Sequence, residues 1–279
     1  MESVTRTVHS AYLQTCQLLG LPVVIKPNST LNQKFDINAD MAISETDKLT
    51  MKYVTIGNGG HKVSTGVNGI PVPEPVQHTP RDAALYNHLP FVLRLPSNDL
   101  TANQRAKYRL RKHEVHDGVN YVAYYLKVLD MAATVPQLEL RTVVNGVTTA
   151  TPYVPTLSDL NPTPPAIGSG GVIVSTGDYI AATAKIPFVM TPDDINELLN
   201  VANVIYGDES YSIISEIGLC SGVDRSVTGD FNGTTTGYTE AIGVQVCNFI
   251  GAFFAAKFSN NGINILFDAG SSEAMLTLS

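Results

Sequence analysis

The chain has 279 residues, of which 44% are hydrophobic and 15% are charged. The hydrophobic fraction is sufficient for a folded core, which excludes a disordered chain. Eighteen basic and twenty-five acidic side chains give a net charge of −7, which argues against a protein that binds nucleic acid over its whole surface. A charged fraction this low is expected of all-β proteins and of proteins whose surface is partly covered in an assembly.

The sequence lacks the signals that are typical of several classes of protein. The three cysteines, Cys16, Cys220 and Cys247, form no CxxC pair, so neither a disulfide framework nor a zinc site is indicated. The N-terminal residues lack the apolar core of a secretory signal. The longest apolar stretch, residues 242–256, is shorter than the ~20 residues of a membrane span, so we expect no membrane contact.

The N-terminal part of the chain predicts one helix, strands and a long arm. Apolar residues at helical intervals from Ser3 to Leu19, followed by Gly20, predict an amphipathic helix. Val23 to Ile25 is a possible strand, and Met51 to Ile56 is a predicted strand. The Gly- and Pro-rich residues from Gly57 to Pro80 predict a long ordered loop or an extended arm.

The central part predicts strands and a short helix. Phe91 to Leu95 alternates as a strand does, and Asp99 or Thr101 can cap a short polar helix that continues to about Lys112. The aromatic and β-branched residues from Tyr121 to Leu129 predict a further strand.

Leu138 to Val144 also alternates, and it leads into Asn145-Gly146, which is typical of a type I′ hairpin turn. Such turns favour a β-rich body. The Asn-Gly pairs begin at residues 58, 68, 145, 232 and 261.

The last third of the chain predicts a linker, strands and one helix. Prolines and glycines between Pro152 and Gly171 disfavour regular structure and indicate a linker. Thr191-Pro192 followed by two acids predicts the start of a helix that runs to about Tyr206. The remaining segments predict strands, at residues 172–174, 179–182, 186–190, 211–220, 243–258 and 263–267.

We therefore expect a mainly β protein of the α+β class, with antiparallel sheets or a β-sandwich body and extended Gly/Pro-rich arms. Four regions are expected: an N-terminal helix with its connecting segment, a β-rich region with the arm and the short basic helix, the linker, and a C-terminal β-rich region with one helix. Their bounds are 1–50, 51–151, 152–171 and 172–279.

The basic run around Tyr108 supplies the candidate interface residues. A solvated helix whose charges pair with acids of a neighbouring subunit explains this run more simply than contact with a polyanion. Arginine and tyrosine are enriched in protein–protein hot spots, so we expect the run to contact a partner protein. The candidates are Arg105, Lys107, Tyr108, Arg109 and Arg111.

Other motifs fail on spacing or context. His113 and His116 are three residues apart, whereas a zincin helix needs histidines four residues apart. The glycines of 57–60 and 168–171 lack the Lys-Ser/Thr pair or the GxGxxG spacing of phosphate-binding loops, and no GxSxG elbow is present. Asp193, Asp194 and Glu197 are explained as helix-start residues before any acid–base role. We expect no catalytic residue, no cofactor and no metal.

Two segments carry a family resemblance. Residues 79–91, TPRDAALYNHLPF, and residues 121–130, YVAYYLKVLD, resemble virion structural proteins of tailed bacteriophages. Within that group the chain is most similar to small baseplate-wedge proteins of contractile-tailed phages, through Lys52 to His61 and Ile263 to Phe267 as well. Most of the likeness lies between Met51 and Pro165. The family has no diagnostic catalytic or ligand motif, so no functional residue is carried over.

The resemblance implies a non-enzymatic structural subunit of a phage particle, located in the virion after assembly in the host cytoplasm. Its expected partners are other virion structural proteins, in a homo-oligomer or a symmetric hetero-assembly, without nucleic acid. One alternative is a neck, tail-completion or capsid-associated subunit whose basic run faces DNA. The other is a carbohydrate-binding module or a β-rich enzyme.

Overall fold

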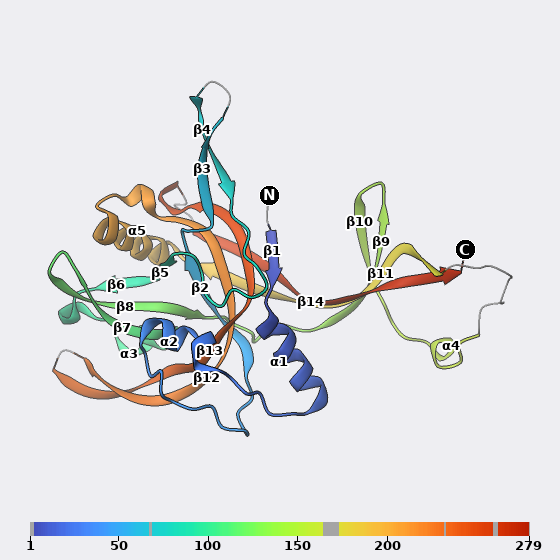
Figure 1. Ribbon diagram of the computed structural model, residues 1–279, viewed down its shortest axis with the longest axis horizontal. Coiled ribbons are helices and arrows are strands. Elements are labelled where there is room, and N and C mark those ends of the chain that lie inside the picture. Colours follow the sequence, from blue (N-terminus) through green and yellow to red (C-terminus); the bar gives the residue numbers. More distant parts are fainter. Residues whose placement is uncertain (1–2, 67–68, 164–172, 232, 259–261, 279) are drawn as a thin grey trace. The chain divides into compact units, whose positions relative to one another are not determined.

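The computed structural model describes residues 3–66, 69–163, 173–231, 233–258 and 262–278 (Figure 1). Antiparallel strands dominate it, and a few helices accompany them, so the predicted β-rich α+β class is confirmed. The chain divides into two compact units. The first comprises Met1–Leu129 and Val189–Ile263, and the second comprises Asp130–Phe188 and Asn264–Ser279.

The first unit is built on an eight-stranded sheet in the order β1-β13-β12-β2-β8-β6, in which β5 also pairs with β2 and β7 with β8. Alternating β-branched, aromatic and small residues form these strands, and their apolar side chains make most of the buried core. The bounds are β1 Ser3–Arg6, β2 Thr50–Gly57, β5 His88–Leu89, β6 Val92–Arg94, β7 Tyr108–His116, β8 Val119–Val128, β12 Ile213–Phe231 and β13 Thr234–Ala255.

The N-terminal segment differs from the prediction at its start. The helix α1 spans Val8–Leu19, with Thr7 as its N-cap and Gly20 in the left-handed conformation as its C-cap. Ser3–Arg6 instead pairs with β13, because an edge position there offers backbone partners that the sequence pattern alone does not show. Val23 to Ile25 is not a strand.

Helix α5, Pro192–Tyr206, matches the sequence prediction. Thr191 and Asp194 form a capping box around Pro192, and Gly207 with a φ of 73° ends the helix. The other helices are short: α2 spans Leu31–Phe35 and α3 spans Ala102–Arg105, with 3₁₀ turns at 27–29, 96–98, 209–211 and 256–258. None of the described helices is long and apolar enough to cross a membrane.

The expected helix through Lys112 is wrong. Only Ala102–Arg105 is helical, and the residues from Tyr108 onward form strand β7 against β8. Residues 108–111 are all buried, and the ten residues of β8 supply a long partner strand for them. Tertiary pairing therefore overrides the local helix signal.

The Gly/Pro-rich arm contains a two-stranded hairpin. Strand β3, His61–Thr65, pairs antiparallel with β4, Pro71–Pro75, and Figure 1 shows this hairpin extending from the rest of the first unit. The expected loop at 57–80 is therefore partly regular structure.

The second unit contains a four-stranded antiparallel sheet in the order β10-β9-β11-β14, in which β11 and β14 are long. Asn145 and Gly146 have φ values of 52° and 77°, which confirms the type I′ turn between β9 and β10. The strand predictions at 179–182 and 186–190 merge into β11. The bounds are β9 Gln137–Val144, β10 Val147–Pro152, α4 Leu157–Leu160, β11 Ile173–Met190 and β14 Ile263–Leu278.

Some sequence predictions fall outside the described residues. One set consists of the asparagines of the expected turns at 68, 232 and 261. The other is residues 164–172, which contain most of the later half of the predicted linker and the first residue of the strand expected at 172–174. Asn58-Gly59 is described, and neither residue has a positive φ, so it does not form the expected turn.

Candidate functional site

The predicted interface residues do not form one exposed patch. Tyr108, Arg109 and Arg111 lie on β7 and are only 7%, 7% and 8% exposed. Arg105 ends α3 and is half-buried, and Lys107, between the two elements, is exposed. The solvated helix face expected at these positions is therefore absent. A partner contact stays a prediction, and among these five residues Lys107 is the exposed one.

The buried members of the run are bound to acids of the same chain. The Tyr108 hydroxyl donates to Asp194 at 2.7 Å. Arg109 Nε donates to Asp224 at 2.8 Å, and Lys52 donates to the other carboxylate oxygen of Asp224 at 3.0 Å. Burial works against ionisation of Asp224, but the hydrogen bonds from Arg109 and Lys52 hold its pKa below the ordinary value.

Arg111 completes this set of contacts. Its Nη2 donates to Asp99 at 2.9 Å, and the Tyr124 hydroxyl donates to the same carboxylate at 2.7 Å. The three acids come from separate elements, so the basic run ties β7 to α5, β12 and the segment before α3. These contacts make the run part of the internal framework of the first unit.

Four of the five candidates also line a cavity of about 150 Å³ with Tyr124, Tyr238 and Glu240. Arg105 lies 3.7 Å from the ring centre of Phe231, and its Nε is buried without a hydrogen-bond partner among the described residues. The volume is enough for a few water molecules. The acids Asp99, Asp224 and Glu240 balance the three arginines around it, so the cavity has no excess positive charge that would select an anion.

Glu240 is fully buried and binds the backbone of β7. Its carboxylate accepts from the N–H groups of Leu110, of Arg111 at 3.0 Å and of Ala241 at 2.8 Å. Leu110 has a φ of 53°, a left-handed conformation that directs two successive N–H groups toward one anion. Burial raises the pKa of Glu240, and these backbone hydrogen bonds act against that rise.

Glu216 plays the corresponding part at the glycine-rich loop after β2. One carboxylate oxygen accepts from the N–H groups of Gly59 and Asn87, each at 2.9 Å. The other accepts from the N–H of Tyr86 at 2.9 Å and faces His78 Nε2 at 2.8 Å. Gly59 of this loop and residues 86 and 87 of a second segment therefore direct three backbone N–H groups at one anion, and that anion is a carboxylate of the chain itself.

His78 links Glu216 to a second acid. Its Nδ1 lies 3.2 Å from Asp82, and its ring stacks between Tyr86 and Phe249 at centroid distances of 4.1 and 3.9 Å. Burial disfavours ionisation of Asp82, but hydrogen bonds from Thr79 and His78 hold its pKa below the ordinary value. His78 and Glu216 are both buried, so this triad is closed to a substrate and acts as a structural clamp.

The remaining sequence candidates show no convergence. His113 and His116 lie on a strand, where residues three apart project from opposite faces, and each contacts its own neighbours, Arg111 and Glu114. The described residues hold no group of three or more His, Cys, Asp or Glu side chains arranged for a metal ion. Asp194 belongs to the capping box of α5, and Glu197 pairs with Arg94.

The sheet of the second unit has two different faces. Directly paired residues share a face, so the registers of β10, β9 and β11 assign the side chains. One face carries Glu139 and Arg141, and Arg141 also binds Asp268 of β14 at 2.9 Å. We call the opposite one the apolar face. Its members are Leu138, Leu140, Thr142, Val144, Val147, Thr149, Thr151, Tyr153, Ile180 and Ala182.

The apolar face is largely uncovered. Leu138, Val144 and Val147 are 43%, 59% and 63% exposed. Among the described residues of the second unit, the buried apolar side chains are Ala181, Ile186, Phe188 and Phe267.

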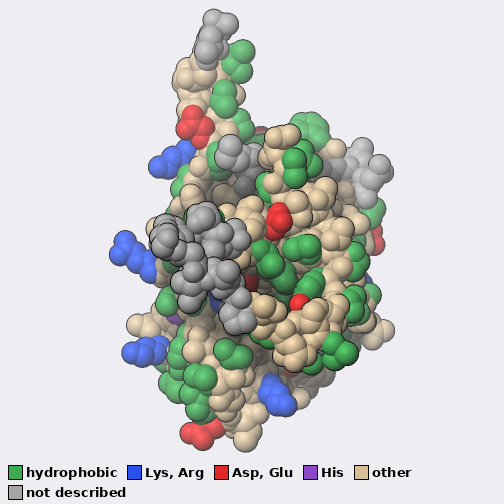
Figure 2. All heavy atoms as spheres, turned by 90° about the vertical axis from the view of Figure 1, so that its right-hand side faces the viewer, with side chains coloured by type: hydrophobic (Ala, Val, Ile, Leu, Met, Phe, Trp, Pro, Cys, Tyr) green, Lys and Arg blue, Asp and Glu red, His purple; other side chains and the backbone are tan. Residues whose placement is uncertain are grey.

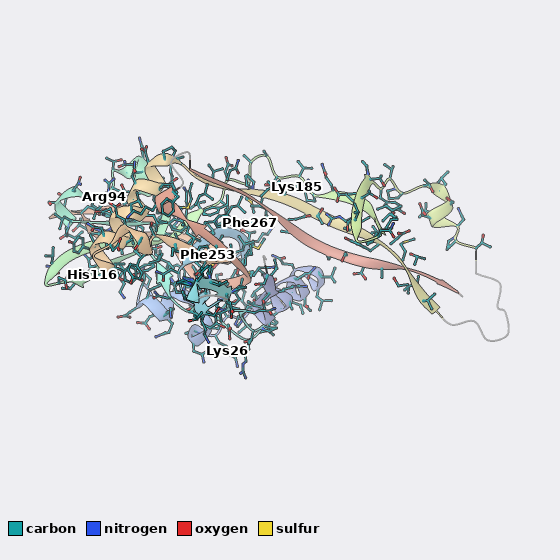
Figure 3. All side chains as sticks on the ribbon, turned by 90° about the horizontal axis from the view of Figure 1, so that it is seen from above. Lys26, Arg94, His116, Lys185, Phe253 and Phe267 are labelled. Atoms are coloured by element: carbon teal, nitrogen blue, oxygen red, sulfur yellow. The ribbon has the colours of Figure 1, made fainter. Side chains whose placement is uncertain are left out.

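The two long strands hold this small core. Phe188 of β11 stacks on Phe267 of β14, and Figure 3 shows Lys185 and Phe267 on these two neighbouring strands. Figure 2 shows few Lys, Arg, Asp and Glu side chains in the view that it draws.

Comparison with known proteins gives the family but no activity. A family model described as a family of unknown function, DUF7208, matches residues 1–279, so the chain belongs to that family. Neither a curated protein nor a solved structure matches the chain.

Proposed function

We propose that the chain is a non-enzymatic structural subunit of a phage particle, such as a tail baseplate wedge, and that it works by protein–protein assembly. The resemblance of residues 79–91 and 121–130 to virion structural proteins supports the phage assignment. The uncovered apolar face of the second unit carries the assembly part of the proposal. Other structural proteins of the particle, or further copies of this chain, would cover that face.

The energetics of the second unit favour a partner. An antiparallel sheet normally packs one face on a core, and a sheet with so few buried apolar side chains gains little from folding alone. Complete burial of a valine or leucine side chain contributes about 1.5–3 kcal/mol. Covering Leu138, Val144 and Val147 would therefore stabilise both the sheet and the assembly.

The first unit supports the same proposal from its polar groups. The buried acids Glu216, Glu240 and Asp99 are bound to backbone or side-chain groups of the chain itself. Such satisfied networks make a fixed scaffold. The basic run that motivated the DNA-facing alternative is mostly used inside this scaffold, with Arg109 and Arg111 paired to acids.

The test compares two adjacent valines on opposite faces of β9. Val144 lies on the apolar face and Val143 on the charged face, and both are exposed. Host cells that express Val144→Asp should yield particles with at least about tenfold less of the chain than the wild type, measured by quantitative mass spectrometry.

Val143→Asp is the matched control and should be incorporated as the wild type is. Equal incorporation of both variants would contradict the role of the apolar face, and particles without the wild-type chain would contradict the proposed function.

A further inference from the structure

Strand β10 is an edge of the second sheet, and its outward backbone groups can be identified. Tyr153 N–H donates to Leu138 C=O at 2.9 Å, which makes this directly opposed pair a hydrogen-bonded one. Hydrogen-bonded pairs alternate in an antiparallel ladder, so the N–H groups of Val147, Thr149 and Thr151 face β9. The N–H and C=O groups of Thr148 and Ala150 therefore face away from the sheet.

This edge is free of charge. All six residues of β10 are exposed, and no charged side chain occurs between Asn145 and Ser158. Natural sheets protect their open edges with charges, prolines, bulges or short strands, because an open edge is a template for pairing. On β10 the single device of this kind is Pro152, at its end.

The β3–β4 hairpin shows how this chain protects another edge. Val76 N–H donates to Gly60 C=O and Gly66 N–H to Ile70 C=O, each at 2.8 Å, so the even-numbered residues of β4 bond to β3. The outward positions of β4 are residues 71, 73 and 75, and all three are prolines, which have no N–H. Strand β14, at the other edge of the second sheet, carries Asp268 and Glu273. β10 carries no charged residue, and of its outward positions only residue 152, at its end, is a proline.

We propose that β10 pairs antiparallel with β10 of a second copy of the chain, about a two-fold axis at Thr149. In this register Thr148 opposes Ala150 of the second copy and Ala150 opposes Thr148, so every outward N–H and C=O of these residues gains a partner. A register centred on Ala150 would place Pro152 opposite Thr148 and leave a carbonyl without a donor. The inference rests on the proposed assembly function and names one interface of it.

Self-pairing fits the chemistry of the strand. With no charge from 145 to 158, two identical strands meet without like-charge repulsion. On the apolar face Thr149 would lie opposite Thr149, and Val147 opposite Thr151. Directly opposed residues share a face, so the two apolar faces would join into one continuous surface across the dimer.

Cysteine cross-linking tests the register. Thr149 is central in a non-hydrogen-bonded pair, where Cα atoms are about 4.5 Å apart and within disulfide range. Thr148 would be diagonal to its own copy at about 7–8 Å, too far for a disulfide without backbone movement. The native Cys16, Cys220 and Cys247 are buried and do not compete.

Under mild oxidation of the full chain, Thr149→Cys should become mainly a disulfide-linked dimer on a non-reducing gel. Thr148→Cys should cross-link at least about tenfold more slowly. Equal rates, or no dimer from Thr149→Cys, would overturn the proposal, as would larger oligomers formed through β14.

A backbone substitution gives a second readout. Ala150→Pro removes an outward N–H that β9 does not use, so it should weaken dimerisation at least about tenfold in sedimentation, while Ala150→Val should not. Unchanged dimerisation of Ala150→Pro would contradict the pairing. If particles contain the chain but Thr149→Cys does not cross-link, this inference alone fails. If cross-linking succeeds and particles lack the chain, the proposed function fails.

Discussion

Replacement of Glu216 by glutamine tests whether the carboxylate clamp holds the first unit together. Glu216 accepts from three backbone N–H groups, of Gly59, Tyr86 and Asn87, and faces His78. The amide of Gln keeps one acceptor oxygen, but its NH₂ group faces at least one backbone N–H, and two donors cannot form a hydrogen bond with each other. The loss of charge-assisted hydrogen bonds in a buried site costs about 3–5 kcal/mol.

The expected change can be measured by denaturant unfolding and calorimetry. A loss of about 3–5 kcal/mol corresponds to a Tm lower by roughly 10 °C for a unit of this size. Glu209→Gln is the matched control, because Glu209 is exposed, and it should change the free energy of unfolding by no more than about 0.5 kcal/mol. If Glu216→Gln is as stable as this control, the clamp does not stabilise the fold as argued.

Three further predictions concern the first unit. Burial lowers the pKa of His88 to about 3, so between pH 6.5 and 3 the unfolded chain takes up a proton that the folded chain does not. The contribution of His88 to the free energy of unfolding is therefore complete above pH 6.5 and is lost toward pH 3. Over this range the difference in the free energy of unfolding between wild type and His88→Gln should shrink by up to about 1.4 kcal/mol per pH unit. A constant difference in urea unfolding would refute this pH dependence. Gly60→Ala places a Cβ 2.4 Å from the backbone oxygen of Ser215, so it should lower the free energy of unfolding by about 1–3 kcal/mol. The control Gly237→Ala, whose Cβ has its nearest atom at 4.0 Å, should change the free energy of unfolding little. Equal effects of the two variants would argue against close packing at Gly60. Tyr108→Phe removes the hydrogen bond to Asp194 and should lower the free energy of unfolding by about 1 kcal/mol, and wild-type stability would show that this bond is not needed.

The sequence predicts correctly the helix start and the turn that are determined by neighbouring residues. The cap, proline and acids at 191–194 defined the start of α5, and Asn145-Gly146 defined the β9–β10 turn. The sequence predicts a helix through residue 112, because the pairing of 108–112 with β8 is not visible in these residues alone. A strand of this kind is fixed by its neighbours in the sheet.

The site depended even more on distant residues. His78 and Glu216 are 138 positions apart, and no spacing rule connects them. The arginines of β7 were expected at the surface, and they are buried because Asp99 and Asp224 arrive from other elements to neutralise them. The strand at 138–144 and the turn after it are predicted by the sequence, but which face of that sheet is apolar emerges only from the registers with β10 and β11.

The most direct test of the central claim is the composition of purified phage particles. Quantitative mass spectrometry after density-gradient purification and a high-salt wash should find the chain at a fixed copy number relative to the other structural proteins. This follows because a subunit held by an apolar interface is not released by salt. A chain that is absent from the particles, or present in variable trace amounts that the wash removes, would contradict the account.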